Sequence, residues 1–439
     1  MSLSLRGNKA ADSILRFDLE TFFEAVQNLY HKEFNPDGTF PLNVAENKLC
    51  WTELKTKMQE ITAREPIPDW VSRYTSAMGH HTVRQVIANF LSRHLTGCPM
   101  NPDNIGMSAG ATSVIEMTSM VLGDPGDVAV FPAPCYPVYK ADIGHKAGVE
   151  RYDLITHHEL SEIQNGPALQ ISHLEKTLED IHSQGKRFRF LVLTTPDNPT
   201  GGAFDFDQLI TIADWCIKKG IHLIVNEIYG LSLIDTSHPD LREDYPNHPK
   251  FKSFANIMAE KQSDFLHLWY AFSKDFGASG FRIGLVYSHN KKFLKAYGNF
   301  NAPNMVSNYT QWVFERVLKD DDFITHYIKT NQQRLTESYA TAIQVFRELD
   351  IPYIPAVGSL FIWIDLSEFL NDQTQAAENE FWLELYRKTG ILLTPGEGFG
   401  HSKKGQFRVV YPCVPLEDLK VALGRFKDFV NMRRNIAVI

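Results

Sequence analysis

The 439-residue chain has no uninterrupted apolar run of the roughly 20 residues that a membrane-spanning helix needs. Residues 1–9 also lack the apolar stretch of a secretory signal. Basic residues are not in excess, because 44 Lys and Arg stand against 52 Asp and Glu, a formal net charge of −8. There is no basic tail and no short-period repeat. We therefore expect no membrane partner and no nucleic-acid partner.

Cysteine is scarce, odd in number and without metal-ligand spacing: Cys50, Cys98, Cys135, Cys216 and Cys413. Neither a disulfide framework nor a metal site is predicted, and reduced thiols indicate a cytoplasmic protein. Cys135 is expected to be a small buried filler rather than a nucleophile. With 44% hydrophobic and 22% charged residues, the composition is that of a globular protein long enough for two lobes.

Candidate helices and strands alternate between about residues 80 and 310. The segments predicted as helices are 82–94, 113–122, 172–184 and 206–219, and the apolar runs predicted as strands are 127–131, 188–194, 223–225 and 265–269. Ser172 is the expected N-cap of its helix, with Glu175 completing a capping box, and Gly220 ends the helix 206–219. This alternation predicts an α/β fold with a large, mostly parallel sheet covered by helices.

The pattern changes after about residue 310, where a long helix over 322–349 precedes strand-like runs at 359–366 and 407–411. We expect a smaller α+β domain at 311–439, a large domain at 51–310, and an N-terminal segment, 1–50, that joins the small domain. Ligands of parallel sheets bind beyond the carboxyl ends of the strands, and a cleft between lobes also suits a small molecule. The polar segment 157–172 is expected to decorate the surface rather than shape the pocket.

The most informative motif is Ser273-Lys274-Asp275-Phe276-Gly277 followed by Gly280-Phe281-Arg282-Ile283-Gly284. A lysine at the mouth of a sheet can form a Schiff base if its pKa is lowered. An arginine can hold a phosphate through paired, charge-assisted hydrogen bonds, and glycines let the backbone approach a cofactor. Together these features indicate pyridoxal 5′-phosphate, although a lysine and an arginine eight residues apart are common by chance.

Other candidate residues follow predicted strands or begin predicted helices, and each has a structural alternative. Gly110-Ala111-Thr112 precedes a helix and suits an anion, or is only a helix start. Tyr136 can face an aromatic ring, or pack in a proline turn. Asn198 and Tyr229 can hydrogen-bond a cofactor oxygen, or belong to turns. Arg408, in an apolar strand, needs either a substrate carboxylate or an internal acid.

In this order the motifs resemble a fold-type-I, class I/II pyridoxal-phosphate aminotransferase, in particular the branch that includes aminocyclopropane carboxylate synthase. The matching pieces run from about residue 41 to 411: Ala45-Glu46-Asn47-Lys48-Leu49-Cys50, Gly110-Ala111-Thr112, Pro134-Cys135-Tyr136-Pro137, Asn198-Pro199-Thr200-Gly201, Glu227-Ile228-Tyr229, the two lysine–arginine segments, Gly358-Ser359-Leu360-Phe361, Pro395-Gly396 and Phe407-Arg408-Val409. Each piece is weak alone, whereas the ordered set is highly specific.

The resemblance implies a role for each residue. Lys274 carries the cofactor and shuttles a proton, which requires a neutral amine and a lowered pKa. The resemblance assigns the remaining contacts as follows: phosphate to Arg282, Gly110, Ala111 and Thr112; the ring face to Tyr136; the ring oxygen to Asn198 and Tyr229; the ring nitrogen to position 226; and the substrate to Arg408 and Glu46. Ser273 is a further cofactor-binding candidate if its side chain faces the phosphate. It also implies a homodimer with the site at the interface.

The chain departs from the family pattern at three positions. Asn226 stands where the family has an aspartate that keeps the ring nitrogen protonated, and losing that buried ionic partner can cost on the order of a thousandfold in rate. Glu227 is adjacent but is expected to point to the opposite face. Ala271 replaces a serine and Ala77 a tyrosine, so the phosphate site can be thinner, while Tyr74 and Gly79 remain.

The sequence supports three hypotheses. The first, which we favour, is an aminotransferase that moves the amino group of an α-amino acid to a 2-oxo acid. The second is a lyase resembling aminocyclopropane carboxylate synthase and using S-adenosylmethionine, which Glu46 favours and Ala77 disfavours. The third is a pyridoxal-phosphate-binding homologue with weak catalysis, suggested by Asn226 alone.

Overall fold

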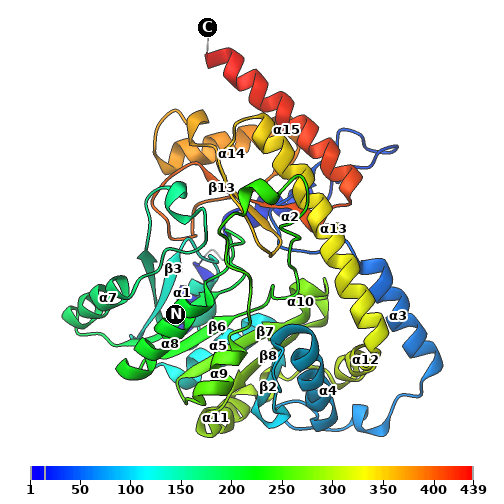
Figure 1. The fold of residues 1–439 in the computed structure, drawn as a ribbon, viewed down its shortest axis with the longest axis vertical. Helices are drawn as coiled ribbons and strands as arrows, with labels where there is room; N and C mark the ends of the chain where they lie inside the picture. Colours follow the sequence, from blue (N-terminus) through cyan, green and yellow to red (C-terminus); the bar gives the residue numbers. More distant parts are fainter. Residues whose placement is uncertain (1, 14–15, 438–439) are drawn as a thin grey trace.

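A seven-stranded sheet forms the centre of the larger part of the molecule (Figure 1). The computed structural model describes residues 2–13 and 16–437. The strand order is β2-β8-β7-β6-β5-β3-β4, and only β8 runs antiparallel to its neighbours. The strands are β2 (Ile105–Ala109), β3 (Val128–Ala133), β4 (Glu150–Ile155), β5 (Phe188–Thr194), β6 (His222–Asn226), β7 (Leu266–Ala271) and β8 (Ile283–Ser288). The predicted α/β class and mostly parallel sheet are therefore confirmed.

Helices cover both faces of this sheet because its strands are apolar on both sides. In β3, Val128 and Val130 belong to one buried cluster, whereas Ala129 and Phe131 belong to another, as alternate strand residues must. The first face is covered by α4 (His81–Leu91), α7 (Ile171–Ser183), α8 (Phe206–Lys219), α9 (Ala255–Lys261) and α12 (Asn308–Lys319). The second is covered by α5 (Gly110–Leu122), α6 (Tyr139–Gly144) and α11 (Lys291–Asn301).

A smaller part of the molecule contains a second core and lies above the large sheet in Figure 1. Its four-stranded sheet has the order β12-β13-β10-β9, from β9 (Tyr353–Ile354), β10 (Phe361–Asp365), β12 (Thr394–Pro395) and β13 (Gln406–Val410). The helices α14 (Gln375–Thr389) and α15 (Leu416–Ala437) pack on it. Phe40 of β1 (Phe40–Pro41), which pairs with β11 (Ile391–Leu392), is buried in the same core.

The long helix α13 (Asp321–Glu348) joins the two cores. Ile324 and Tyr327 belong to the core under the large sheet, and Leu335 and Phe346 belong to the second core. The division between the cores therefore falls inside α13, while the domain limits 1–50, 51–310 and 311–439 stay a prediction. The remaining helices are α1 (Leu5–Ala11), α2 (Leu19–Ala25), α3 (Trp51–Arg64) and α10 (Phe272–Asp275).

Two predictions about the segment before α7 were wrong. The N-cap of α7 is Gln170, not Ser172, because the Gln170 side chain and the ring of His173 form the reciprocal capping pair. The segment 157–172 is not simply surface decoration, since Leu160 and Ile163 are buried against Trp363 and Phe399. The predicted strand 188–194 and helix 206–219, by contrast, match β5 and α8, and Gly220 ends α8 in the left-handed region.

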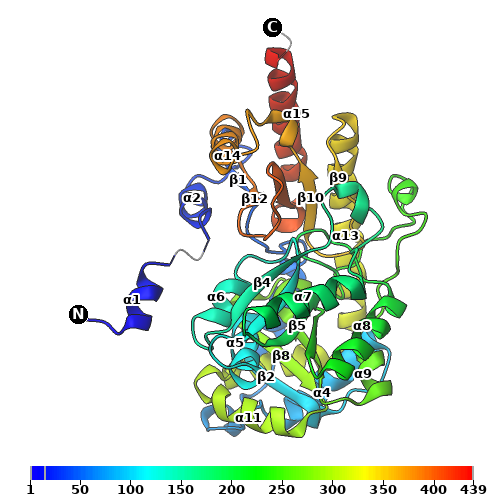
Figure 2. The same ribbon diagram turned by 90° about the vertical axis from the view of Figure 1, so that its left-hand side faces the viewer.

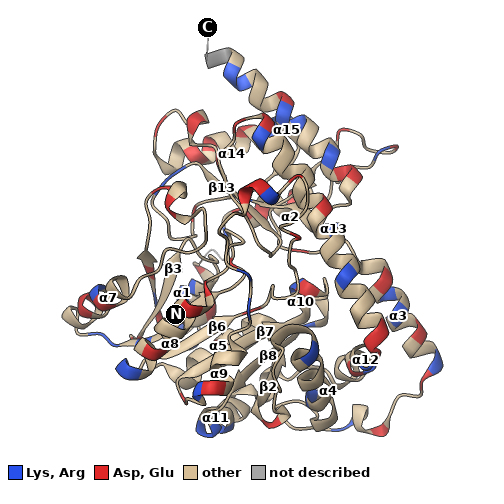
Figure 3. Cartoon of the chain, in the orientation of Figure 1, with Lys and Arg blue, Asp and Glu red and all other residues tan. Residues whose placement is uncertain are grey.

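The surface of the described residues has three further features. No helix of the described residues is both long enough and apolar enough to cross a bilayer. In Figure 3, acidic and basic residues are interspersed along α3, α13 and α15. The helix α1 has no buried residue and stands apart from the body of the molecule in Figure 2.

Candidate active site

The carboxyl ends of the parallel strands open into a cavity of about 230 Å³. Lys274 follows β7, Asn226 ends β6, Asn198 follows β5, and Tyr136 follows β3, so the parallel sheet itself brings these residues together. The other lining residues named in the sequence are Ala111, Thr112, Tyr229, Ser273, Arg282 and Arg408. The structure therefore gathers nearly all of the predicted site into one place.

Lys274 lies in the short helix α10, and its side chain is largely buried. Its Nζ donates a hydrogen bond of 2.6 Å to the carbonyl oxygen of Ala45. Burial, reinforced by the positive charge of Arg408, lowers the pKa of Lys274 from 10.5 to about 8. At pH 7 roughly a tenth of this amine is therefore neutral, far more than for a free lysine, and the neutral form is the one that acts as a nucleophile or a base.

Arg282 and the start of α5 form the part of the cavity that suits a phosphate. Arg282 is left-handed, with φ of 54°, and its Nη1 donates to the carbonyl oxygen of Ser279 at 3.0 Å. Gly110, with φ of +85°, lies beneath this guanidinium so closely that a Cβ atom would collide with it. The free N–H groups at the start of α5 add to the charge of Arg282 at an anion.

The opposite polar wall joins a phenol, an amide and a guanidinium. Asn198 Nδ2 donates to the hydroxyl of Tyr229 at 3.4 Å, and Asn198 Oδ1 accepts from Arg408 Nη1 at 2.9 Å. The ring of Tyr136 also lines the cavity and meets Tyr139 edge to face at 5.3 Å. A flat ligand can therefore lie against Tyr136 with its polar edge at Asn198 and Tyr229.

Arg408 is buried, and every hydrogen-bond partner the structure gives it is neutral. Its Nη atoms bind Asn198 Oδ1, the carbonyl oxygen of Asn43 at 2.8 Å and Thr394 Oγ1 at 3.2 Å. Its guanidinium lies 4.5 Å above the ring of Phe361, and burial lowers its pKa to about 10. Of the two readings of Arg408 left open above, the structure favours a charge kept for a ligand carboxylate.

Three residues discussed in the sequence analysis lie outside the lining of the cavity. Glu46 does not line the cavity, and its carboxylate instead lies 3.4 Å from Lys48 Nζ at the half-exposed surface. Ala77 and Ala271 do not line the cavity either. Ser273 and Ser279 do line it, so the cavity has serine residues although Ala271 replaces the serine that the family has three residues before the lysine.

Two charged residues of the cavity were missed by the sequence analysis. Arg16 precedes α2, and its Nε binds Asp18 Oδ1 at 2.8 Å while its side chain stays 12% exposed. Asp142 lies one turn after Tyr139 on α6, and burial with the nearby Glu116 raises its pKa to about 8. The sequence gives one indication of these residues: Asp142 stands three positions after Tyr139, a spacing that places both side chains on one face of a helix.

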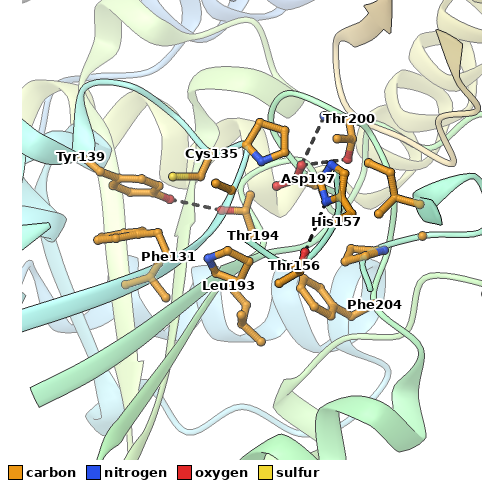
Figure 4. A pocket seen from close by; sticks show the side chains of 17 residues that line it. Phe131, Cys135, Tyr139, Thr156, His157, Leu193, Thr194, Asp197, Thr200 and Phe204 are labelled. Carbon is orange, nitrogen blue, oxygen red and sulfur yellow. Dashed lines mark hydrogen bonds between the residues drawn. The ribbon is translucent and has the colours of Figure 1, made fainter. Parts of the chain in front are cut away.

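A second cavity, of about 40 Å³, is shown in Figure 4 and shares part of its lining with the first. Tyr139 and Thr194 line both cavities and separate them. Its buried acid, Asp197, accepts a hydrogen bond from Thr200 Oγ1 at 2.8 Å, and burial raises its pKa to about 6. Cys135 is buried here, and burial raises the pKa of its thiol strongly, so it is no nucleophile.

The described residues fit pyridoxal phosphate. Ser273 Oγ and Arg408 Nε are buried at the cavity and have no hydrogen-bond partner among the described residues. A bound phosphate and a bound carboxylate are acceptors that such donors require. With a lowered-pKa lysine between them, at the carboxyl ends of a mostly parallel sheet, these groups define a pyridoxal-phosphate-dependent enzyme of fold type I.

Comparison with known proteins gives the family. A family model described as aminotransferase class I and II matches residues 42–426, and the chain belongs to this family. It is 28% identical over 94% of its length to a 1-aminocyclopropane-1-carboxylate synthase of Glycine max, covering 84% of that protein. With 1-aminocyclopropane-1-carboxylate synthase 7 of Arabidopsis thaliana it shares 27% identity over 93% of its length and 90% of the relative.

Solved structures give the same fold. An archaeal alanine:glyoxylate aminotransferase superposes with a TM-score of 0.80 at 17% identity, over 98% of each chain. An aromatic aminotransferase of Pyrococcus horikoshii has a TM-score of 0.74 at 19% identity, over 90% of this chain and 96% of the other. At these identities the likeness establishes the fold alone, and family membership establishes pyridoxal phosphate as the cofactor.

Proposed function

We propose that this enzyme is an aminotransferase that moves an amino group from an α-amino acid to a 2-oxo acid. The observation that carries the proposal is the charge of the cavity. Its lining includes Lys274, Arg282 and Arg408, together with Arg16, which Asp18 balances, against one described carboxyl group in the lining, that of Asp142. Because its pKa is raised to about 8, Asp142 is mostly protonated at pH 7. Such a cavity suits anionic amino and oxo acids.

The roles of the residues follow from their contacts. Arg408, held by Asn198 and the Asn43 carbonyl, binds the substrate carboxylate and so orients the reacting carbon. The neutral amine of Lys274 accepts a proton from that carbon and returns it, because its pKa lies near the working pH. Tyr136 closes one wall against water. Pyridoxal phosphate, when bound, supplies the electron sink for the bond that breaks.

An absorbance titration tests this proposal. Cofactor-loaded protein is mixed with one amino acid at a time, without a 2-oxo acid. We expect at least one amino acid to convert the cofactor to pyridoxamine phosphate, and a 2-oxo acid to restore it. The Lys274→Ala variant is the matched control, because it retains the carboxylate site of Arg408 and loses the amine. A panel of amino acids that leaves the cofactor unchanged in wild type contradicts the proposal.

A lyase that uses S-adenosylmethionine is the second candidate. It is supported by the names of the two plant relatives and by the extent of their similarity to this chain. The cavity opposes it, since a sulfonium cation would enter near Lys274, Arg282 and Arg408, none of which has a carboxylate partner in the lining, and Glu46 lies outside the lining. Consumption of S-adenosylmethionine without transfer of an amino group would establish this candidate and exclude the first.

A homodimer in the cytoplasm belongs to the same proposal. The side chain of Tyr74 is 102% exposed and that of Leu5 is 81% exposed, so both are available to a second copy. All five cysteines are free, which fits the reduced thiols expected in a cytoplasmic protein. Sedimentation of the cofactor-loaded protein measures the oligomeric state directly.

A further inference from the structure

We propose that Asn226, held in orientation by Tyr139, donates a hydrogen bond to the ring nitrogen of pyridoxal phosphate and keeps that nitrogen unprotonated. The proposal requires that the cofactor binds, which family membership establishes. It does not depend on which reaction follows, so it stands or fails separately from the aminotransferase assignment.

The hydrogen bonds of Asn226 fix which amide atom is which. The backbone N–H of Ile228 can only donate, and it lies 3.2 Å from Asn226 Oδ1. The other amide atom, Nδ2, therefore donates to the hydroxyl oxygen of Tyr139 at 3.0 Å. A flipped amide would place two donors together at Ile228, so this orientation is the stable one.

The hydroxyl of Tyr139 continues the same chain of hydrogen bonds. Because its oxygen accepts from Asn226, its own proton is free for Thr194 Oγ1, 3.2 Å away. Figure 4 shows the phenol directed at this threonine, and both residues line the two cavities. Tyr139 is buried and its hydroxyl is bonded to both Asn226 and Thr194, so it holds the amide in place.

What Asn226 can offer the cavity is therefore a donor. An amide nitrogen has two hydrogens, and Tyr139 takes one. The other remains for a ligand, because Asn226 lines the cavity. Oδ1 already accepts from the Ile228 N–H, so Nδ2 is the amide atom with a hydrogen that no described residue uses. An N–H group pairs with an acceptor, which an unprotonated pyridine nitrogen is and a protonated one is not.

The covalent structure of the cofactor places its ring nitrogen near this amide. Neighbouring ring carbons carry the hydroxyl, formyl and phosphate-bearing groups, for which Tyr229 with Asn198, Lys274 and Arg282 are the cavity's partners. The ring nitrogen lies across the ring from the formyl carbon, on the side away from Lys274. Position 226, at the carboxyl end of the central strand β6, is the amide that remains for it.

No nearby acid replaces the missing carboxylate. Glu227 points away from the cavity, where its carboxylate accepts from Ser253 Oγ at 2.7 Å and from the backbone N–H of Phe254. Asp142 lines the cavity with Oδ2 unpaired among the described residues, but burial keeps it protonated and without charge. A neutral amide and a neutral carboxyl group give a protonated ring nitrogen no counter-ion.

Nitrogen NMR of the protein reconstituted with pyridoxal phosphate labelled with ¹⁵N in the ring tests the proposal. Protonation of a pyridine nitrogen moves its resonance strongly upfield. We expect the wild-type resonance at the downfield, unprotonated position, and the Asn226→Asp resonance at the upfield position. In Asn226→Asp, Tyr139 and Thr194 can reverse their hydroxyl protons, so the network accepts the carboxylate.

Each outcome of the NMR experiment either supports or overturns the proposal. An upfield wild-type resonance overturns the proposal, whatever group supplies the proton, and needs no variant. A downfield resonance in both proteins shows that Asn226 is not the cause and also overturns it. For Tyr139 as the positioning residue, we expect Tyr139→Phe to stay downfield and to bind the cofactor several-fold more weakly. Unchanged affinity in Tyr139→Phe removes the role of Tyr139.

Discussion

At the scale of single residues, the electrostatic surroundings of Lys274 determine when its amine can react. Burial and Arg408 lower its pKa to about 8, whereas the carboxylate of Glu46 acts in the opposite direction. Below this pH the amine is mostly protonated, and the protonated form is no nucleophile. The same residue therefore links the geometry of the cavity to the pH dependence of cofactor attachment.

We predict that the rate at which the cofactor-free protein takes up pyridoxal phosphate rises with pH and levels off above about 8. Arg408→Gln removes a charge that lowers the pKa of Lys274, so its midpoint moves to higher pH. Glu46→Gln removes a charge that raises it, so its midpoint moves to lower pH. Stopped-flow absorbance measures all three profiles, and coincident midpoints would refute this electrostatic account.

Arg408 supplies a second prediction. In Arg408→Lys the charge remains but the fork that binds both Asn198 and the Asn43 carbonyl is lost. Because hydrogen bonds to charged groups contribute about 1.5–3 kcal/mol, we expect the KM for the amino acid to rise about 10- to 150-fold. Steady-state kinetics checks this, and an unchanged KM shows that the substrate carboxylate binds elsewhere.

The site residues differ in how far the sequence could predict them. Lys274, Asn198 and Arg408 stand in motifs at the ends or in the middle of apolar strands, and a parallel sheet gathers strand ends at one edge. Arg16 lies in no motif, and only the path of the N-terminal segment brings it to the cavity. The orientation of the Asn226 amide depends on Tyr139 and Ile228, which sequence spacing does not relate to it.

At the scale of elements, the backbone conformation at the start of α5 lets Arg282 lie close to the proposed phosphate site. Gly110 and Gly126 both have positive φ, +85° and +90°, so alanine strains either backbone by about 1 kcal/mol. At Gly110 the added carbon also collides with the Arg282 guanidinium, whereas at Gly126 nothing lies within 4 Å. The two positions form a matched pair.

We predict that Gly110→Ala weakens the affinity for pyridoxal phosphate at least tenfold, because Arg282 must move, and that Gly126→Ala leaves it unchanged. Thermal unfolding without cofactor should show a similar small loss of stability in both variants. Fluorescence titration with pyridoxal phosphate gives the affinities. Equal affinities in the two variants would mean that Arg282 does not hold the phosphate.

Elements defined by their own sequence were predicted well, and those defined by distant contacts were not. The helix α8 begins at Asp205, whose carboxylate caps two backbone N–H groups, and ends at Gly220 in the left-handed region. The cap of α7 was misplaced because Gln170 caps less often than the serine two residues later. Similarly, the segment 157–172 is polar in sequence, and its burial depends on distant residues. Leu160 and Ile163 complete a core with Trp363 and Phe399.

At the scale of the whole molecule, α1 is a helix that the rest of the described chain does not bury. It has seven residues and none is buried, and an isolated helix of this length is unstable in water. Figure 2 shows it standing away from both cores. A second copy of the chain would give its apolar side chains, Leu5 among them, a surface to cover.

We predict that the cofactor-loaded protein sediments as a dimer and that deleting residues 1–12 raises the dimer dissociation constant at least tenfold. The deletion removes no residue that lines the cavity, so the cofactor spectrum should stay unchanged. A full-length protein that remains monomeric at micromolar concentration would contradict the proposed dimer.

The reaction type is the central claim, and transfer of an isotope tests it most directly. The cofactor-loaded protein is incubated with one unlabelled 2-oxo acid at a time and a mixture of uniformly ¹⁵N-labelled amino acids from which the amino acid corresponding to that 2-oxo acid is left out, and mass spectrometry follows the label. We predict that ¹⁵N appears in the amino acid derived from at least one 2-oxo acid, and that Lys274→Ala abolishes the transfer. If no 2-oxo acid acquires label, and a parallel incubation of the same protein with S-adenosylmethionine consumes it, the enzyme is a lyase and the aminotransferase assignment is wrong.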